Sequence, residues 1–150
     1  MTFGVLALTV AALFTGAALY VSFVEHPARS LLNDRAQLEQ WKPSYTRGAL
    51  MQGSLSMLGF VLGALAWYRT GDSRWLVGAV VLLAGWPYTL FFIMPTNKAL
   101  KAISAADVSP TSRALMHRWG RLHAVRTALG VASTAIFVWV SIADQAIGSL

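Results

Sequence analysis

The sequence predicts an all-α fold: one domain of 150 residues built as a bundle of four transmembrane helices. Only 12% of the residues are charged, against about 25% in a typical soluble domain. The mean hydropathy of the chain is +0.56. Crossing the hydrocarbon core of a bilayer takes about 20 apolar residues of helix. Four stretches meet this length: Met1–Val24, Gly48–Tyr68, Trp75–Met94 and Leu122–Ala143.

The basic residues indicate how such a bundle is oriented. The first connection holds four of them and the third holds five, whereas the second holds only Arg69 and Arg74. Cytoplasmic loops of membrane proteins carry the excess of Lys and Arg. We therefore expect loops 1 and 3 in the cytoplasm, both termini outside, and the cytoplasmic membrane as the location. The net charge of +6 is interpreted as a topology signal and not as nucleic-acid binding.

The first connection also carries helix signals. Asn33 is a residue type that caps helix N-termini, and Asp34 would favour the first turn. A short helix is therefore predicted over Asp34–Trp41, lying at the membrane interface and ended by Pro43.

Prolines mark the later helices as well. Pro87 predicts a kink inside the third span, and Pro95 predicts its end. Ser109 and Pro110 have the residue types of an N-cap and first helical position. Nothing breaks the helix from Thr111 to Ala143, so the fourth helix is expected to be about 50 Å long and to extend beyond the bilayer.

Polar and aromatic residues gather at the cytoplasmic ends of the four spans. Trp119, His123 and Arg126 are spaced i, i+4 and i+7, so they share one helix face. Tyr45 and Gln52 share a face of the second span in the same way. The spacing predicts a common polar pocket near one surface of the bilayer.

An arginine below the membrane interface is costly unless it is paired. Glu25 is the acid at a matching depth, so we expect an ion pair or hydrogen-bonded network between Glu25 and Arg126, with His123 beside it. Two simpler readings remain open. The Glu25–Arg126 network could have the purely structural role of locking the helix ends together. Alternatively, Arg126 could reach toward the lipid headgroups.

The residue types limit the available chemistry. The chain has no cysteine, which excludes disulfides, thiolate ligands, iron–sulfur clusters and cysteine nucleophiles. His117 and His123 lie on different helix faces, and no HExxH motif is present. Two alternatives therefore stay open: chemistry without a cofactor, or a copper or iron site whose ligands would be Glu25, His26 and His123.

Several motifs together resemble a known family, the anthrone oxygenase-like family of small four-helix membrane proteins, much of which has no known function. The motifs are Tyr20–Glu25, Trp41–Tyr45 with Arg47, Pro87–Leu90, Ile93–Asn97, and Trp119–His123 with Arg126. The resemblance covers nearly the whole chain. It implies a four-helix membrane bundle and, for the characterised fungal-type members, oxygenation of a polyketide anthrone to an anthraquinone without haem or flavin. The site residues that it implies are Glu25, Tyr45, Arg47, Pro95, Thr96, Asn97, Trp119, His123 and Arg126.

Two hypotheses follow. In the first, the protein is an oxygenase-type enzyme for a lipophilic phenolic, anthrone- or quinone-like molecule. His123 is then the base, oriented by Glu25, while Arg126 and Asn97 stabilise a developing oxyanion. The expected substrate-binding residues are Trp41, Tyr45, Gln52, Thr96 and Trp119.

In the second hypothesis the protein is a non-catalytic membrane protein that binds a small lipophilic ligand or a partner. The polar cluster is then a structural lock. Gly59 and Gly63 have the GxxxG spacing that allows close helix approach, either within the bundle or in a homo-oligomer.

Overall fold

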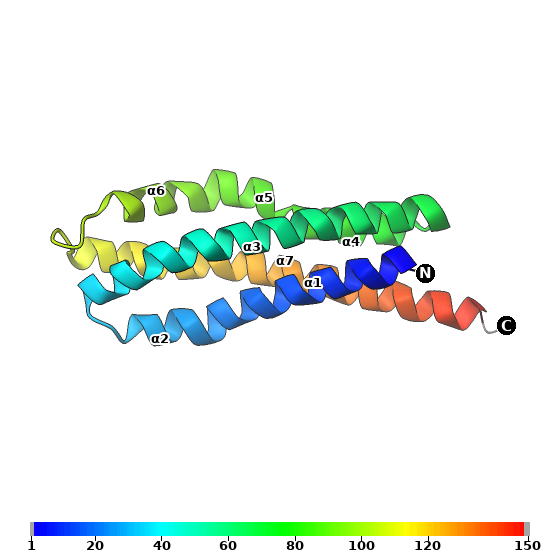
Figure 1. Cartoon of the computed structure of the whole chain (residues 1–150), viewed down its shortest axis with the longest axis horizontal. Helices are drawn as coiled ribbons and strands as arrows, with labels where there is room; N and C mark the ends of the chain where they lie inside the picture. Colours follow the sequence, from blue (N-terminus) through cyan, green and yellow to red (C-terminus); the bar gives the residue numbers. More distant parts are fainter. Residues whose placement is uncertain (1, 149–150) are drawn as a thin grey trace.

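The computed structural model describes the backbone of residues 2–148 and the side chains of residues 2–143, and every regular element in that range is helical. Four rods lie side by side (Figure 1). The first consists of α1 (Thr2–Tyr20), η1 (Val21–Glu25) and α2 (His26–Ser30), and the second is α3 (Asp34–Thr70). The third consists of α4 (Ser73–Leu83), α5 (Gly85–Tyr88), η2 (Thr89–Ile93) and α6 (Met94–Ala102), and the fourth is α7 (Pro110–Gly148). All four rods are long and apolar enough to cross a membrane.

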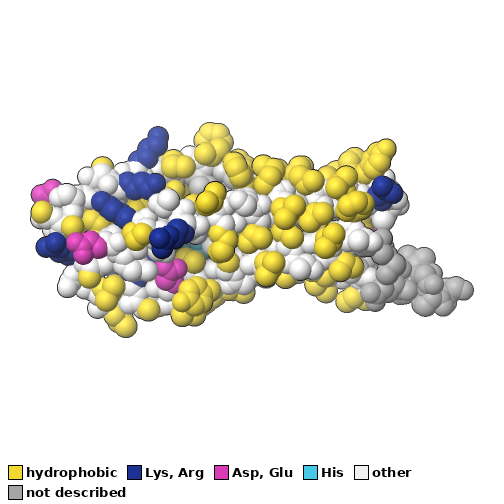
Figure 2. Space-filling view, in the orientation of Figure 1, with side chains coloured by type: hydrophobic (Ala, Val, Ile, Leu, Met, Phe, Trp, Pro, Cys, Tyr) yellow, Lys and Arg dark blue, Asp and Glu magenta, His cyan; other side chains and the backbone are white. Residues whose placement is uncertain are grey.

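Successive rods run in opposite directions. The connections at residues 31–33 and 103–109 lie at one end of the bundle, and the short connection at residues 71–72 lies at the other (Figure 1). Lys, Arg, Asp and Glu side chains gather at the end that holds the two longer connections (Figure 2). Apolar side chains cover most of the remaining face. Which end of the bundle faces the cytoplasm stays a prediction.

Three prolines lie inside rods, although the sequence predicts that helices end at two of them, Pro43 and Pro95. Pro27 is in α2, Pro43 is in α3 and Pro95 is in α6. The prediction of a separate interfacial helix over Asp34–Trp41 is therefore wrong, because this segment forms the first turns of α3. Each of these prolines is exposed, so its ring displaces no packing neighbour inside the bundle.

Two widened turns precede two of these prolines. In η1 the His26 N–H bonds the Val21 carbonyl, and in η2 the Met94 N–H bonds the Thr89 carbonyl, each five residues back. Proline lacks an N–H and its ring crowds the preceding turn. A π turn just before Pro27 and Pro95 accommodates this crowding, and such turns occur frequently at functional sites.

Other local expectations are confirmed. The Asn33 side chain accepts a hydrogen bond from the Ala36 N–H at 2.9 Å and caps α3. The third rod breaks at Ala84, three residues before Pro87, and Figure 1 shows the break between α4 and α5. The fourth rod begins at Pro110 and continues unbroken through the rest of the described chain.

The helices pack closely at the end of the bundle that lies opposite the two longer connections. A Cβ on Gly63 would lie 2.8 Å from Ala79 Cβ and 3.0 Å from Phe137 Cζ, and a Cβ on Gly59 would lie 2.5 Å from Leu82. Both glycines therefore serve contacts within the bundle. Oligomer formation stays a prediction.

Candidate functional site

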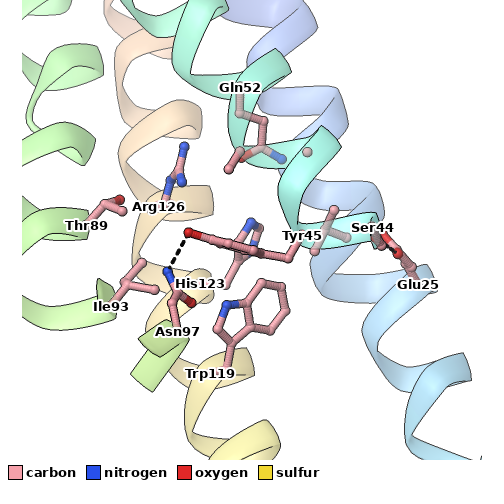
Figure 3. Close-up of a pocket in the computed structure, with 13 residues that line it drawn as sticks. Glu25, Ser44, Tyr45, Gln52, Thr89, Ile93, Asn97, Trp119, His123 and Arg126 are labelled. Carbon is pink, nitrogen blue, oxygen red and sulfur yellow. Dashed lines mark hydrogen bonds between the residues drawn. The ribbon is translucent and has the colours of Figure 1, made fainter. Parts of the chain in front are cut away.

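A cavity of about 60 Å³ lies between the first rod, α3, η2 and α7, at the level of the two π turns. Figure 3 shows side chains from all four rods around it. Its polar and aromatic lining is Glu25, Ser44, Tyr45, Gln52, Thr89, Asn97, Trp119, His123 and Arg126. Seven of the residues nominated from the sequence line this one cavity: Glu25, Tyr45, Gln52, Asn97, Trp119, His123 and Arg126.

Polar groups from three helices converge on one side of this cavity. The Asn97 Nδ2 donates to the Tyr45 hydroxyl at 2.9 Å. Figure 3 shows the Arg126 side chain next to this pair. The Asn97 Oδ1 and the Arg126 Nε are buried and have no hydrogen-bond partner among the described residues. Buried polar atoms without partners are rare and costly, so these two atoms indicate a place for a polar ligand atom.

His123 is fixed from two directions. Its ring stacks on Trp119 with centroids 5.2 Å apart, and its Nδ1 lies 3.2 Å from the Ser22 Oγ. Ser22 lies in η1 and also contacts the Thr127 Oγ1 at 2.8 Å. His123 Nε2 has no hydrogen-bond partner within residues 2–143, so it is available to a ligand. Ser22, which the sequence reasoning missed, takes the contact that had been expected from Glu25.

The prediction that Glu25 pairs with Arg126 is wrong. Glu25 Oε1 accepts from Arg29 Nη2 at 2.5 Å, and Arg29 is almost fully buried. Figure 3 shows Glu25 and Arg126 on opposite sides of Tyr45. The reason is that the helix continues through Pro27, which places Arg29 one turn beyond Glu25. The i, i+4 spacing of these two residues was the available signal.

Two hydrogen-bonding residues of α3 complete the group around Glu25. The Gln40 Nε2 donates to Glu25 Oε1 at 3.1 Å, and the Ser44 hydroxyl donates to the same oxygen. Arg29 Nε donates to Gln40 Oε1. We call Glu25, Arg29, Gln40 and Ser44 the α2–α3 lock, because they join these two helices.

Two of the expected substrate-binding residues do not line the cavity. Trp41 is completely buried behind Tyr45, with the two rings stacked at 4.9 Å, and its other side meets Trp119 edge-on at 5.9 Å. Thr96 is buried in α6 outside the cavity lining. Trp41 therefore supports the cavity wall without contacting its contents. Arg47, implied by the family resemblance, is exposed.

The conditional metal ligands are not assembled. Across the described part of the chain, no three His, Cys, Asp or Glu side chains are grouped so that they could hold a metal ion. His26 packs against Trp119 with ring centroids 5.6 Å apart, and His117 is exposed. The set Glu25, His26 and His123 therefore does not fit a metal centre.

Comparison with known proteins agrees with this architecture. A family model described as anthrone oxygenase matches residues 41–136, which include every cavity residue except those of the first rod. The chain is 31% identical over 144 residues to an anthrone oxygenase of Claviceps purpurea (strain 20.1), covering 85% of this chain and 82% of that protein. No solved structure gives a significant match. The chain belongs to the anthrone oxygenase family.

Proposed function

We propose that the protein is a membrane-embedded oxygenase that converts the acidic CH₂ group of a lipophilic, anthrone-like molecule into a carbonyl group with dioxygen. The observation that carries the proposal is the convergence of unpartnered polar atoms of Asn97 and Arg126 beside His123 in one cavity. The family membership supports the same reaction class.

The reaction begins with removal of a proton from the CH₂ carbon. His123 is the base, because its Nε2 is available while Ser22 and Trp119 hold the ring. Loss of the proton sends the electron pair toward the carbonyl oxygen of the substrate. That oxygen becomes an oxyanion, and the carbon becomes electron-rich.

The oxyanion needs donors that are already in place. Arg126 supplies a half-buried cation whose Nε is buried, and the Tyr45 hydroxyl is free to donate its own proton because it accepts from Asn97. Donors fixed before the charge develops stabilise it without reorganisation. This assigns Arg126 and Tyr45 to the substrate oxygen and makes Asn97 the residue that positions Tyr45.

Dioxygen then adds to the electron-rich carbon. A carbon–oxygen bond forms, and the resulting peroxide takes up a proton to give a hydroperoxide. The second proton leaves the same carbon, the oxygen–oxygen bond breaks, and water departs. One oxygen atom ends in the new carbonyl and the other in water. The electrons that reduce dioxygen come from the two carbon–hydrogen bonds, so no other reductant takes part.

The proposed setting is a bilayer with this cavity near the cytoplasmic surface. The support is that the cavity lies toward the end of the bundle that holds the connections at residues 31–33 and 103–109. Most Lys and Arg side chains gather at this end, on the helix turns that flank the two connections (Figure 2). A reporter that is active only in the cytoplasm should be inactive when fused to the C-terminus and active when inserted at residues 103–109. The reverse pattern would contradict the proposed orientation.

Turnover of anthrone in labelled dioxygen tests the reaction. Purified protein in lipid nanodiscs, given anthrone and ¹⁸O₂, should form anthraquinone with one labelled oxygen above the spontaneous background. His123→Ala should lower the rate by about 10²- to 10⁴-fold, the usual contribution of a general base. His117→Ala is the matched control, because His117 is an exposed histidine on the same helix. Equal rates for wild type and His123→Ala would refute the assignment of the base.

A non-catalytic ligand-binding protein is the second candidate. It is favoured by the α2–α3 lock, in which Glu25 Oε1 already accepts from Arg29, Gln40 and Ser44. Anthrone binding without any dioxygen consumption would support this candidate over the oxygenase.

A further inference from the structure

The cavity at His123 is too small to hold a whole tricyclic molecule. Its volume is about 60 Å³. Ligand pockets for small molecules usually measure about 300–1,000 Å³. Under the proposed function, only the reacting edge of the substrate fits beside His123 and Arg126. The remaining rings must lie elsewhere.

We propose that the substrate enters sideways from the bilayer through the seam between α3 and α5–η2, and that its outer rings rest there in the bound state. The seam is the line of contact formed by Ala49 and Gly53 on α3 and by Gly85 and Trp86 on α5. In this proposal Gly53 and Trp86 set the size of the ring system that the protein accepts. The inference rests on the proposed function for the identity of the substrate.

Adjoining spaces connect the cavity to the outer surface. A second cavity of about 170 Å³ shares Tyr45, Ala49, Thr89 and Arg126 with the first. A groove of about 580 Å³ on the outside shares Ala49, Gly53 and Trp86 with the second cavity. The shared residues make one path, which runs from the Arg126 guanidinium to the exposed face of α3.

The path is open for a local reason. The break at Ala84 separates the line of α5 from that of α4. On the two facing helices the lining residues are small: a Cβ added to Gly53 would approach only Trp86, at 3.9 Å, and one added to Gly85 would approach only the Arg126 Nε, at 4.0 Å. At glycines in the packed helix contacts an added Cβ would collide, as at Gly78, where Phe137 would lie 2.6 Å away.

Trp86 forms a fixed wall of the seam. Its Nε1 donates to the Ser56 Oγ at 2.8 Å, and Ser56 is buried. The indole is therefore held in place while 42% of the residue surface stays exposed. A flat, fixed aromatic face beside a glycine suits the insertion of another flat ring system.

The outer groove favours an apolar substrate. The groove residues on α3 include Leu50, Met57, Leu58 and Val61, which are exposed apolar side chains. The groove also contains the small hydroxyl of Ser54. None of the described residues that line it is charged. A polycyclic aromatic molecule dissolved in the lipid matches this mouth. A charged, water-soluble substrate does not.

Filling the seam tests the entrance. Gly53→Leu should raise the KM for anthrone by about tenfold or more, the scale of one misplaced apolar group in a binding site, with kcat changed far less. Gly16→Leu is the matched control, because Gly16 is an exposed helical glycine whose added Cβ would meet nothing within 4 Å. This control should stay within about twofold of wild type. An unchanged KM in folded Gly53→Leu would overturn the entrance and leave the proposed function standing.

Photolabelling supplies a measurement that does not depend on turnover. An anthracene carrying a diazirine, added to the protein in nanodiscs and irradiated, should form adducts at the seam, for example on Met57 and Trp86. Excess anthrone should suppress these adducts, and Gly53→Leu should abolish them. Adducts that anthrone does not suppress would indicate that lipid chains occupy the groove, and would overturn the proposal. Displaceable adducts without anthrone oxidation would support the entrance while refuting the oxygenase.

Discussion

Two polar groups flank Tyr45, and they differ in how completely their atoms are paired. In the α2–α3 lock, Glu25 accepts from Arg29, Gln40 and Ser44. On the other side, Asn97 Oδ1 and Arg126 Nε are buried without partners among the described residues. Both groups were reasonable candidates for a site. Their hydrogen bonds separate them, because the carboxylate of the lock is paired with its cation, whereas the Asn97 and Arg126 atoms at the cavity keep hydrogen-bonding capacity for a ligand.

The lock is not perfectly satisfied, and the exception is informative. Arg29 Nη1 is buried without a hydrogen-bond acceptor. The Arg29 guanidinium lies 5.7 Å from the centre of the Trp119 ring, where the aromatic face attracts a cation. Trp119 also stacks on His123. The lock therefore supports the reactive side of the cavity from behind.

Removing the charge of Glu25 should have the largest effect on stability. Glu25→Gln leaves the buried Arg29 cation without its counter-charge, which costs about 3 kcal/mol or more. Thermal unfolding in nanodiscs would measure the loss. Glu39→Gln is the matched control, because Glu39 also pairs with an arginine at i, i+4 but is exposed. That pair should contribute about 0.2–1 kcal/mol. Equal losses for the two variants would contradict the lock.

Removing Arg126 should show the opposite pattern. Arg126→Met should lower kcat for anthrone by about 10²- to 10³-fold, the usual cost of losing an oxyanion donor. The melting temperature should stay the same or rise, because the variant removes a buried polar group that lacks a partner. Arg121→Met, at an exposed position on the same helix, serves as the control. A fall in stability like that of Glu25→Gln would make Arg126 part of a structural network.

Much of the cavity could be predicted because helical spacing is a local property. The i, i+4 and i+7 pattern brings Trp119, His123 and Arg126 to one face wherever the helix continues, and the same applies to Tyr45 and Gln52. All five line the cavity. The four rods followed from the length of the apolar stretches, which composition alone reveals.

The partners of the polar groups could not be predicted, because they depend on how the chain passes its prolines. The sequence prediction ends the first span at Val24, which leaves Arg29 in the first connection and Glu25 free for Arg126. In the structure the π turn η1 carries the helix past Pro27, so Arg29 comes within reach of Glu25. The same turn presents Ser22 to His123. Sequence spacing alone does not reveal such a widened turn.

Ser22 offers a finer test of the reactive side. Ser22→Ala removes the contact to His123 Nδ1 and should lower kcat by about two- to tenfold, as expected for one hydrogen bond, with little change in KM. Ser22→Thr keeps a hydroxyl and should restore most of the rate. Ser30→Ala, which removes only a bond to the His26 carbonyl in the same rod, is the control. A change in KM alone would contradict a role in holding the base.

A polar pair at the opposite end of the bundle should show the smallest effect. Asp72 caps α4 by accepting from the Arg74 N–H at 2.9 Å, and hydrogen bonds from the Arg74 side chain, foremost among the causes, hold the pKa of Asp72 below its usual value. Asp72→Ala should cost about 0.5–1 kcal/mol in thermal unfolding at pH 7, as a lost N-cap does.

The sign of its pH dependence follows from the lowered pKa. The stabilisation is complete above the unfolded value of about 3.9 and disappears as the pH falls through the folded pKa. Asp72→Asn keeps a capping side chain and should remove this acid-sensitive contribution while retaining most of the stability at pH 7. Glu25 and Asp72 are similarly exposed, but the Arg29 side chain is 1% exposed whereas the Arg74 side chain is 32% exposed. If Asp72→Ala destabilised the bundle as much as Glu25→Gln, the contrast between a lock built on a buried arginine and a cap beside a partly exposed one would fail.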